Sequence, residues 1–456
     1  MLKLMLKFSI LMIILSSCSI DEEVTTPSDP RFIVPTIIPN GDEKYLVMDS
    51  DYIFNQDKLH TFKLKITETA LAKIDADPAA EEYIEGMLIF NEDTISPVGI
   101  RYKGSVGAFV GCLSGSDWSN PSGHKTCTKL SMKVKINWEG REENFYKLKK
   151  LQFHSQNLDE SKMHERLGYW LFRAMGVPAP RSVHARLIIN DKYSGLFALT
   201  EQIDGRFTRY NFNDGEGNLY KEVWPISMNG VPQSDRVYIN ALRTNEDDNP
   251  SIDIIKNFAQ QISDGDSVDI QNVISESMDV TEILSVAVVD RMIRNDDGPF
   301  HWYCEDGKCS NHNYYWYEEP TNEKLHLIPW DLDNAFENII SNANPVTPIA
   351  DDWGHATANC EPFGYGFLNI YQRSAACDKL TAGWTSFGIE YDQLRTKFVN
   401  STFSKAQVNT LLDTWSQQIR EAILEASNTH DDAISVGKWE NAIEKLKNQL
   451  EFARNN

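Results

Sequence analysis

Basic residues are scarce in this chain of 456 residues, because 44 Lys and Arg stand against 66 Asp and Glu and give a formal net charge of −22. A surface this acidic repels nucleic acid and anionic lipid surfaces, so we expect no nucleic-acid partner. Internal apolar runs long enough to cross a membrane are missing, as are internal repeats, which argues against a membrane-spanning or repeat architecture. The hydrophobic content of 41% nevertheless supports a sizeable core, and the length favours two or three domains or one large two-lobed unit.

The N-terminus carries the pattern of an export signal. Two lysines precede the apolar stretch 8–15, and the sequence LSSC that ends at Cys18 resembles a bacterial lipobox, in which the cysteine is lipidated. An ordinary signal peptide with a chance cysteine is the alternative. We predict a signal peptide over 1–17, a lipid anchor at Cys18 and a flexible tether over 18–43, which places the protein on the bacterial outer membrane or cell surface.

Six cysteines remain besides Cys18, and an even number in an exported protein favours disulfides. They fall into three pairs that are close in sequence, which suggests the bridges Cys112–Cys127, Cys304–Cys309 and Cys360–Cys377. Other connectivities stay open. A zinc site is the weaker alternative, because no pair has the two-residue spacing of zinc ligands.

One stretch in the second half of the chain holds the clearest chemical pattern. Asp296 and Asp297 come first, Asn313 opens an aromatic strand, and Asp331 and Asp333 follow a further apolar run. Such acids and amides at strand ends suit a divalent cation and phosphoryl transfer, in which one Asp orients an attacking hydroxyl and the other groups supply oxygen ligands to Mg²⁺. A calcium site or ordinary turn acids are the alternatives.

Strand patterns concentrate in residues 44–205 and helical patterns in residues 206–456. Within the first half, residues 129–136 alternate strictly, with Lys129 and Lys133 on one face and apolar side chains on the other. This strand either has a solvated basic face or points one lysine into a nucleotide cleft. The order of a β-rich N-lobe and a mostly α-helical C-lobe predicts an α+β, protein-kinase-like bilobal fold.

Several motifs, in order over residues 58–340, resemble the spore-coat CotH kinase family. They are VGIRYKG ending at Gly104, the Lys129 strand, ERLGYWLFRAMGVPAP from Glu165, GLFALTEQID ending at Asp204, GNLYK ending at Lys221, NYYWY from Asn313 and IPWDLD ending at Asp333. Members of this family are atypical secreted or surface protein kinases that phosphorylate Ser or Thr on partner proteins. The resemblance implies ATP and Mg²⁺ or Mn²⁺ as cofactors for this chain.

The resemblance also implies roles for the acids and the amide. Asp297 matches the catalytic Asp, Asn313 and Asp331 match metal ligands, and Asp333 is the second acid of the same metal motif. Fifteen residues separate Asp297 from Asn313, whereas four do so in protein kinases. We interpret the difference as an inserted hairpin, and it leaves the choice between Asp296 and Asp297 open.

The remaining implied roles concern the nucleotide. Gly104 and Ser105 lie where a turn covers the phosphates, and Glu201 and Asp204 lie at the hinge, where Asp204 can accept hydrogen bonds from the ribose. Either Lys129 or Lys133 contacts phosphate, with Glu165 as its helix partner, although Glu160 is an alternative.

The combined reading is a surface-anchored kinase that transfers the γ-phosphate of ATP to Ser or Thr of secreted or envelope proteins. A catalytically inactive adhesin or structural surface protein of the same fold is the alternative. The retained acids at Asp297 and Asp331 and the amide at Asn313 favour the active enzyme. A carbohydrate-binding module, suggested by 11 Trp, ranks last because aromatic residues more often belong to the core.

Overall fold

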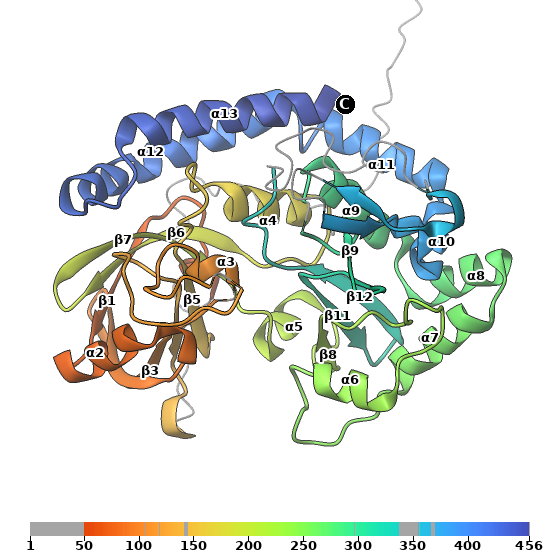
Figure 1. The fold of residues 1–456 in the computed structure, drawn as a ribbon, viewed down its shortest axis with the longest axis horizontal. Helices are drawn as coiled ribbons and strands as arrows, with labels where there is room; N and C mark the ends of the chain where they lie inside the picture. The colour runs from red at the N-terminus through yellow and green to blue at the C-terminus, as the bar shows by residue number, and fades with distance from the viewer. Residues whose placement is uncertain are drawn as a thin grey trace, which may run out of the picture.

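The computed structural model describes residues 50–104, 106–117, 119–140, 145–295, 297–336, 354, 356–365 and 370–455. The fold mixes helices and strands, as predicted, with a barrel formed by the first half of the chain and a mostly helical part formed by the second (Figure 1). The predicted signal peptide, the anchor at Cys18 and the tether lie outside the described residues, as do Ser105 and Asp296.

Seven strands close the barrel in the order β1-β2-β3-β4-β5-β7-β6. Their bounds are β1 His60–Lys65, β2 Ile84–Phe90, β3 Asp93–Tyr102, β4 Met132–Lys135, β5 Lys150–His154, β6 Ser182–Ile189 and β7 Lys192–Thr200. Short helices lie on its outside: α1 Ser50–Ile53, α2 Glu68–Ala76 and α3 Val106–Phe109. The barrel core mixes aliphatic and aromatic side chains, and the rings of Phe62 and Phe90 stack with 4.7 Å between their centroids.

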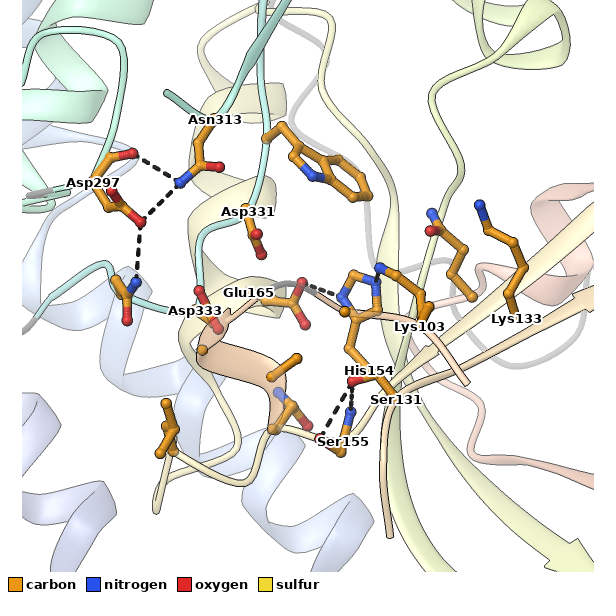
Figure 2. A pocket seen from close by; sticks show the side chains of 18 of the residues that line it. Lys103, Ser131, Lys133, His154, Ser155, Glu165, Asp297, Asn313, Asp331 and Asp333 are labelled. Carbon is orange, nitrogen blue, oxygen red and sulfur yellow. Dashed lines mark hydrogen bonds and ion pairs between the residues drawn. The ribbon is translucent and has the colours of Figure 1, made fainter. Parts of the chain in front are cut away.

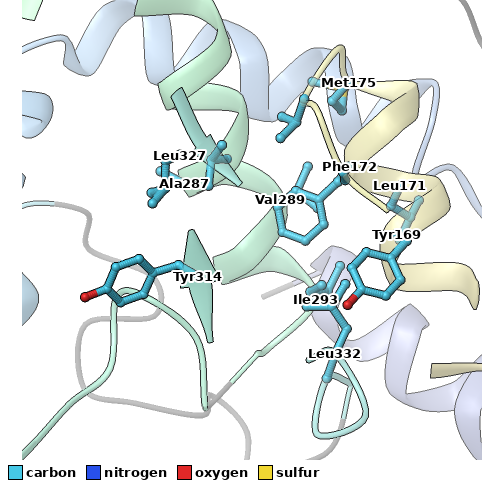
Figure 3. Packing of buried hydrophobic residues seen from close by; sticks show 14 of the residues in the cluster. Tyr169, Leu171, Phe172, Met175, Ala287, Val289, Ile293, Tyr314, Leu327 and Leu332 are labelled. Carbon is cyan, nitrogen blue, oxygen red and sulfur yellow. The ribbon is translucent and has the colours of Figure 1, made fainter. Parts of the chain in front are cut away.

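Helix α4 (His164–Ala174) connects the barrel to the helical part. Most of its side chains are buried, and Figure 3 shows Phe172 of this helix beside Val289 of α9. The segment before the helix is fixed by two side chains: Asp159 Oδ2 accepts from His164 N at 2.9 Å, and Ser161 Oγ accepts from Met163 N at 3.1 Å.

The helical part surrounds α9 (Val280–Met292), which is buried on nearly all sides. The other helices are α5 Gly205–Asn211, α6 Asp235–Ala241, α7 Asp253–Asp264, α8 Ser267–Ser277, α10 Lys379–Thr385, α11 Gly388–Asn400, α12 Lys405–Thr429 and α13 Val436–Asn455. One sheet joins β12 (Lys324–Pro329), β11 (Tyr314–Glu319) and β8 (Leu219–Lys221). A second sheet joins β10 (Lys308–Ser310), β9 (Trp302–Glu305), β14 (Ile370–Arg373) and β13 (Phe363–Tyr365).

Helices α12 and α13 form a long hairpin that runs over both parts of the molecule, and α12 packs on β7 (Figure 1). The turn of the hairpin bonds to the barrel. Asp432 accepts hydrogen bonds from the backbone N and the Oγ1 of Thr128 at 2.7 and 2.6 Å. His430 Nε2 also lies 2.7 Å from Tyr193 O. This hairpin therefore holds the barrel to the helical part, in addition to α4 and the chain that follows β7.

The three suggested disulfides are all formed: Cys112–Cys127, Cys304–Cys309 and Cys360–Cys377. The second one joins β9 to β10, where its two cysteines are register partners. The inserted hairpin expected between Asp297 and Asn313 therefore exists. Within the described ranges, no helix has both the length and the apolar character needed to cross a membrane.

Candidate active site

A cleft of about 540 Å³ lies where the barrel meets the helical part (Figure 2). Its barrel side is mainly basic and its helical side mainly acidic, with Glu81 on the first and Lys221 on the second as exceptions. The basic wall, from the barrel, comprises Lys103, Lys133 and His154. The acidic wall, from the helical part, comprises Asp297, Asn313, Asp331 and Asp333, and Glu165 of α4 lies between the two walls.

Asp297 and Asn313 form a bonded pair on the acidic wall. Asn313 Nδ2 donates to the backbone carbonyl of Asp297 at 2.9 Å and to its Oδ2 at 3.0 Å, and Asn334 Nδ2 donates to the same Oδ2 at 3.3 Å. Burial raises the pKa of Asp297 to about 6, although the nearby His312 lowers it. The amides thus fix the direction of this carboxylate, and the amide oxygen of Asn313 takes no part in fixing it.

Asp331 and Asp333 follow β12 and are held by backbone hydrogen bonds. Asp331 N donates to the Tyr169 hydroxyl of α4 at 3.0 Å, and the carbonyl of Asp333 lies 2.9 Å from His164 Nδ1. Asp331 and Asn313 have φ values of +55° and +61°. Such left-handed conformations cost roughly 1–3 kcal/mol each in residues with a side chain and cluster at functional sites.

The two acids also repel each other. Burial raises the pKa of Asp331, although the charge of Lys103 lowers it. Burial raises the pKa of Asp333 well above its usual value, and the charge of Asp331 raises it further. The acidic wall therefore carries more negative charge than its protein neighbours offset.

On the opposite side, an imidazole links a lysine to a glutamate. Lys103 Nζ lies 2.7 Å from His154 Nε2, and His154 Nδ1 lies 2.6 Å from Glu165 Oε1. Because an ammonium only donates, Nε2 must accept from Lys103, which assigns the ring proton to Nδ1 and makes it the donor to Glu165. Glu165 thus orients Lys103 through His154 rather than by direct contact.

Lys133 completes the basic wall from β4. Its register partner on β3 is Arg101, which pairs with Glu81. Burial lowers the pKa of Lys133 to about 7, and the charges of Lys103 and other basic neighbours lower it further. Gly104, also in the cleft, donates its N–H to Glu81 Oε1 at 2.8 Å.

Three residues assigned to the nucleotide do not line this cleft, which corrects those predictions. Lys129 Nζ donates to Leu196 O at 2.6 Å, because β4 begins only at Met132 and the lysine face does not extend back to Lys129. The Glu201 carboxylate is buried and accepts from Arg181 N and Nε at 3.1 and 2.9 Å. The third, Asp204, lies at the start of α5.

Asp204 caps helix α5, because its Oδ1 accepts from Arg206 N at 2.9 Å. The neighbouring Gln202 lines the cleft instead. Sequence reasoning also missed Lys103, assigned to a turn, and His154. The available signal was positional, because Lys103 directly follows β3 and His154 ends β5, so both stand at strand ends that open into the cleft.

The oxygen donors on the acidic wall fit a hard divalent cation. Asp331, Asp333 and the Asn313 amide offer the oxygen ligands that Mg²⁺ and Mn²⁺ prefer. In the part of the chain that the structure describes, no three His, Cys, Asp or Glu side chains converge to hold a metal by themselves. Mg²⁺ can be held by one or two carboxylates and complete its shell with water and phosphate oxygens.

Comparisons with known proteins agree with these features. Among proteins with curated functions, none matches the chain. The family described as CotH kinase protein matches residues 100–455, a range that contains every residue of both walls. The match covers most of the chain and confirms the resemblance found in the sequence motifs. The chain belongs to the CotH kinase protein family.

Proposed function

We propose that the protein is a kinase that transfers the γ-phosphate of ATP to Ser or Thr hydroxyls of secreted or envelope proteins. The observation that carries the proposal is the cleft itself, where an oriented carboxylate and oxygen donors face two lysines. Its volume of about 540 Å³ suits a nucleotide-sized ligand. In this proposal, the barrel and the helical part are the small and large lobes of an atypical kinase-like bilobal fold.

The acidic wall supplies the groups that act on the acceptor and hold the metal. Asp297 orients the acceptor hydroxyl and takes its proton, a task for which a carboxylate with a pKa raised to about 6 is suited. Asn313, Asp331 and Asp333 hold Mg²⁺ or Mn²⁺. When bound, that cation offsets the negative charge of the phosphates.

The basic wall holds the triphosphate. Lys103 and Lys133 donate to phosphate oxygens, and His154 and Glu165 keep the Lys103 ammonium in place by the hydrogen bonds already described. The Trp330 ring, 5.5 Å from Lys103 Nζ, further restricts that ammonium. Transfer then depends on positioning and charge, because both reactants are held between the two walls.

The test is to incubate the purified mature protein with γ-labelled ATP, Mg²⁺ or Mn²⁺ and an envelope extract. We expect label on Ser or Thr of extract proteins, and no label when Asp297→Asn or Asp331→Ala replaces the wild-type protein. Label that persists in both variants would come from a contaminating kinase. The protein would then be better described as a catalytically inactive binding protein.

We also propose that a lipid at Cys18 anchors the protein to the outer membrane or cell surface. The lipobox-like sequence and the three disulfides, which require an oxidising compartment, support export. Cys18→Ala should release the protein or leave its signal peptide uncleaved, as measured by cell fractionation. Equal membrane attachment of the variant and the wild type, with the signal peptide removed from both, contradicts the anchor.

A further inference from the structure

A second cavity, of about 550 Å³, lies between the barrel and the start of α13. Asn157 and Leu158 line both this cavity and the cleft, so one short segment separates the two. Leu158 and Val110 are 56% and 41% exposed at its edge. The proposed phosphoryl transfer gives this cavity no role.

Two lysines line the cavity from the barrel side. Lys129 Nζ donates to Leu196 O at 2.6 Å, and Lys162 Nζ donates to Gln156 O at 2.7 Å. Lys162 is only 7% exposed. An ammonium carries three donors, and the structure shows only a backbone carbonyl as the hydrogen-bond partner of each. Both lysines therefore keep donors for a further ligand.

Burial of these lysines outweighs the acidic groups near them, which for Lys162 are Asp159 and Glu160. Burial lowers the pKa of Lys129 well below its usual value, and the charge of Lys162 lowers it further, whereas Asp432 and Asp159 act in the opposite direction. The Asp159 carboxylate already accepts from Ser161 and His164, and Asp432 accepts from Thr128. No ion pair joins Lys129 or Lys162 to a carboxylate among the described residues.

The start of α13 adds to the positive character of the cavity. Ser435 and Lys438 line it, and a helix of 20 residues begins at Val436 with backbone N–H groups that have no partner inside the helix. Glu160 and Asp431 also line the cavity, but both are exposed and well solvated. An anionic group is thus favoured inside, whereas a ligand that is acidic throughout is disfavoured at the rim.

We propose that this second cavity binds a phosphoryl group carried on the acceptor protein, a phosphoserine or phosphothreonine near the residue to be phosphorylated. The inference rests on the proposed function. A phosphoryl group offers oxygens that can accept from Lys129 and Lys162 together, and Val110 and Leu158 contact the peptide that carries it. Because Asn157 and Leu158 belong to both cavities, one peptide can occupy them at once. The product of one transfer then becomes a ligand that guides the next.

The test is a binding measurement on the mature protein without nucleotide or metal. Fluorescence anisotropy compares a labelled peptide that has one phosphoserine and neutral flanking residues with its unphosphorylated form. We expect the phosphopeptide to bind about tenfold more tightly or better, and inorganic phosphate to compete with it. Lys129→Met and Lys162→Met, which keep the length of the side chain and remove its charge, should each abolish that preference. Lys192→Met, an exposed lysine on the same barrel, is the matched control and should bind like the wild type.

Equal binding of the two peptides overturns the inference. So does an unchanged preference for the phosphopeptide in Lys129→Met, provided that this variant unfolds at the same temperature as the wild type. A preference lost in Lys103→Met but kept in Lys129→Met also overturns it, because the peptide would then lie in the cleft. This binding assay contains no nucleotide, so its result does not depend on phosphoryl transfer. Phosphopeptide binding without any label transfer to envelope proteins would refute the proposed function and leave this site standing, and transfer without phosphopeptide binding would refute this site alone.

Discussion

The acidic and basic walls of the cleft are built in different ways. The acidic wall comes from one continuous stretch, 297–333, whose members bond directly, as Asn313 does to Asp297. The basic wall brings together the ends of β3 and β5 and the middle of β4, which become neighbours when β4 pairs with β3 on one side and with β5 on the other. One wall is a local motif, and the other is a product of the tertiary fold.

Burial shifts the pKa values of the side chains on the two walls in opposite directions. Burial raises the pKa values of Asp331 and Asp333 and lowers those of Lys103 and Lys133, so each wall holds its charge at a cost. A ligand with a cationic and an anionic end, such as a metal–triphosphate complex, can offset the buried negative charge of one wall and the buried positive charge of the other. The difference between the walls therefore favours one composite ligand over a metal or a nucleotide alone.

Removal of an acid that we propose as a metal ligand should have the largest effect. Asp331→Ala should abolish metal-dependent nucleotide binding and phosphoryl transfer, because no neighbouring oxygen replaces its carboxylate. Thermal-shift titration with ATP and Mg²⁺, together with label incorporation, measures both effects. Asp392→Ala, an exposed acid on α11, is the control. If ATP and Mg²⁺ still raise the unfolding temperature of Asp331→Ala, the metal is bound by other residues.

Replacement of the oriented carboxylate should affect the rate alone. Asp297→Asn keeps the shape of the side chain but cannot take a proton, so transfer should fall by about 10²–10⁴-fold while nucleotide binding stays nearly intact. Single-turnover transfer and nucleotide titration on the same protein separate these effects. Asp296→Asn should be much milder, and the opposite ranking of the two variants would shift the catalytic assignment by one residue.

Variants of the basic wall should weaken binding by intermediate amounts. Lys103→Met removes an ammonium held by His154 and should raise the nucleotide Kd on the order of 10- to 100-fold. Lys133→Met should have a smaller effect, because Lys133 has no such fixed partner among the described residues. Calorimetric titration with ADP and Mg²⁺ measures both, with Lys192→Met as the control. Equal losses would show that His154 contributes nothing to the position of Lys103.

The smallest expected effect is a pH dependence that comes from Lys133. With a pKa of about 7, its amine loses its proton as pH rises, so nucleotide affinity should fall by about three- to tenfold between pH 6.5 and 8. Lys133→Met should flatten this dependence. Since folding lowers this pKa, the unfolded chain binds more protons above pH 7, and this residue makes stability rise with pH over the same range. An unchanged pH profile in Lys133→Met would assign the titration to another group.

The same contrast explains what the sequence could reveal. Asp297, Asn313, Asp331 and Asp333 are recognisable because a motif of acids and an amide lies within a few dozen residues, and the structure brings all four into one cleft. The alternation over residues 129–136 also correctly identified its buried face. The start of β4 and its pairing with β3 and β5 depend on distant segments, however, and they decide which lysine faces the cleft.

Local sequence patterns also could not identify the hydrogen-bond partners of these residues. Glu201 has the position of a hinge residue, but Arg181, twenty residues earlier, takes its carboxylate through the pairing of β6 with β7. His154 reads as one more residue at the end of an alternating strand, and only the approach of α4 gives it Glu165 as a partner. Hydrogen bonds between distant segments therefore separate residues of the cleft from residues that support the fold.

The hairpin of α12 and α13 has a mechanical consequence. Two bodies joined at one place can rotate freely relative to each other, whereas attachments at several separate places restrict that rotation. The bonds from Asp432 to Thr128 and from His430 to Tyr193 add an attachment to those made by α4 and by the chain that follows β7. Rotation of the barrel relative to the helical part should therefore be restricted, and a proteolytic nick in the turn that contains His430 and Asp432 should increase it without altering any side chain of the cleft.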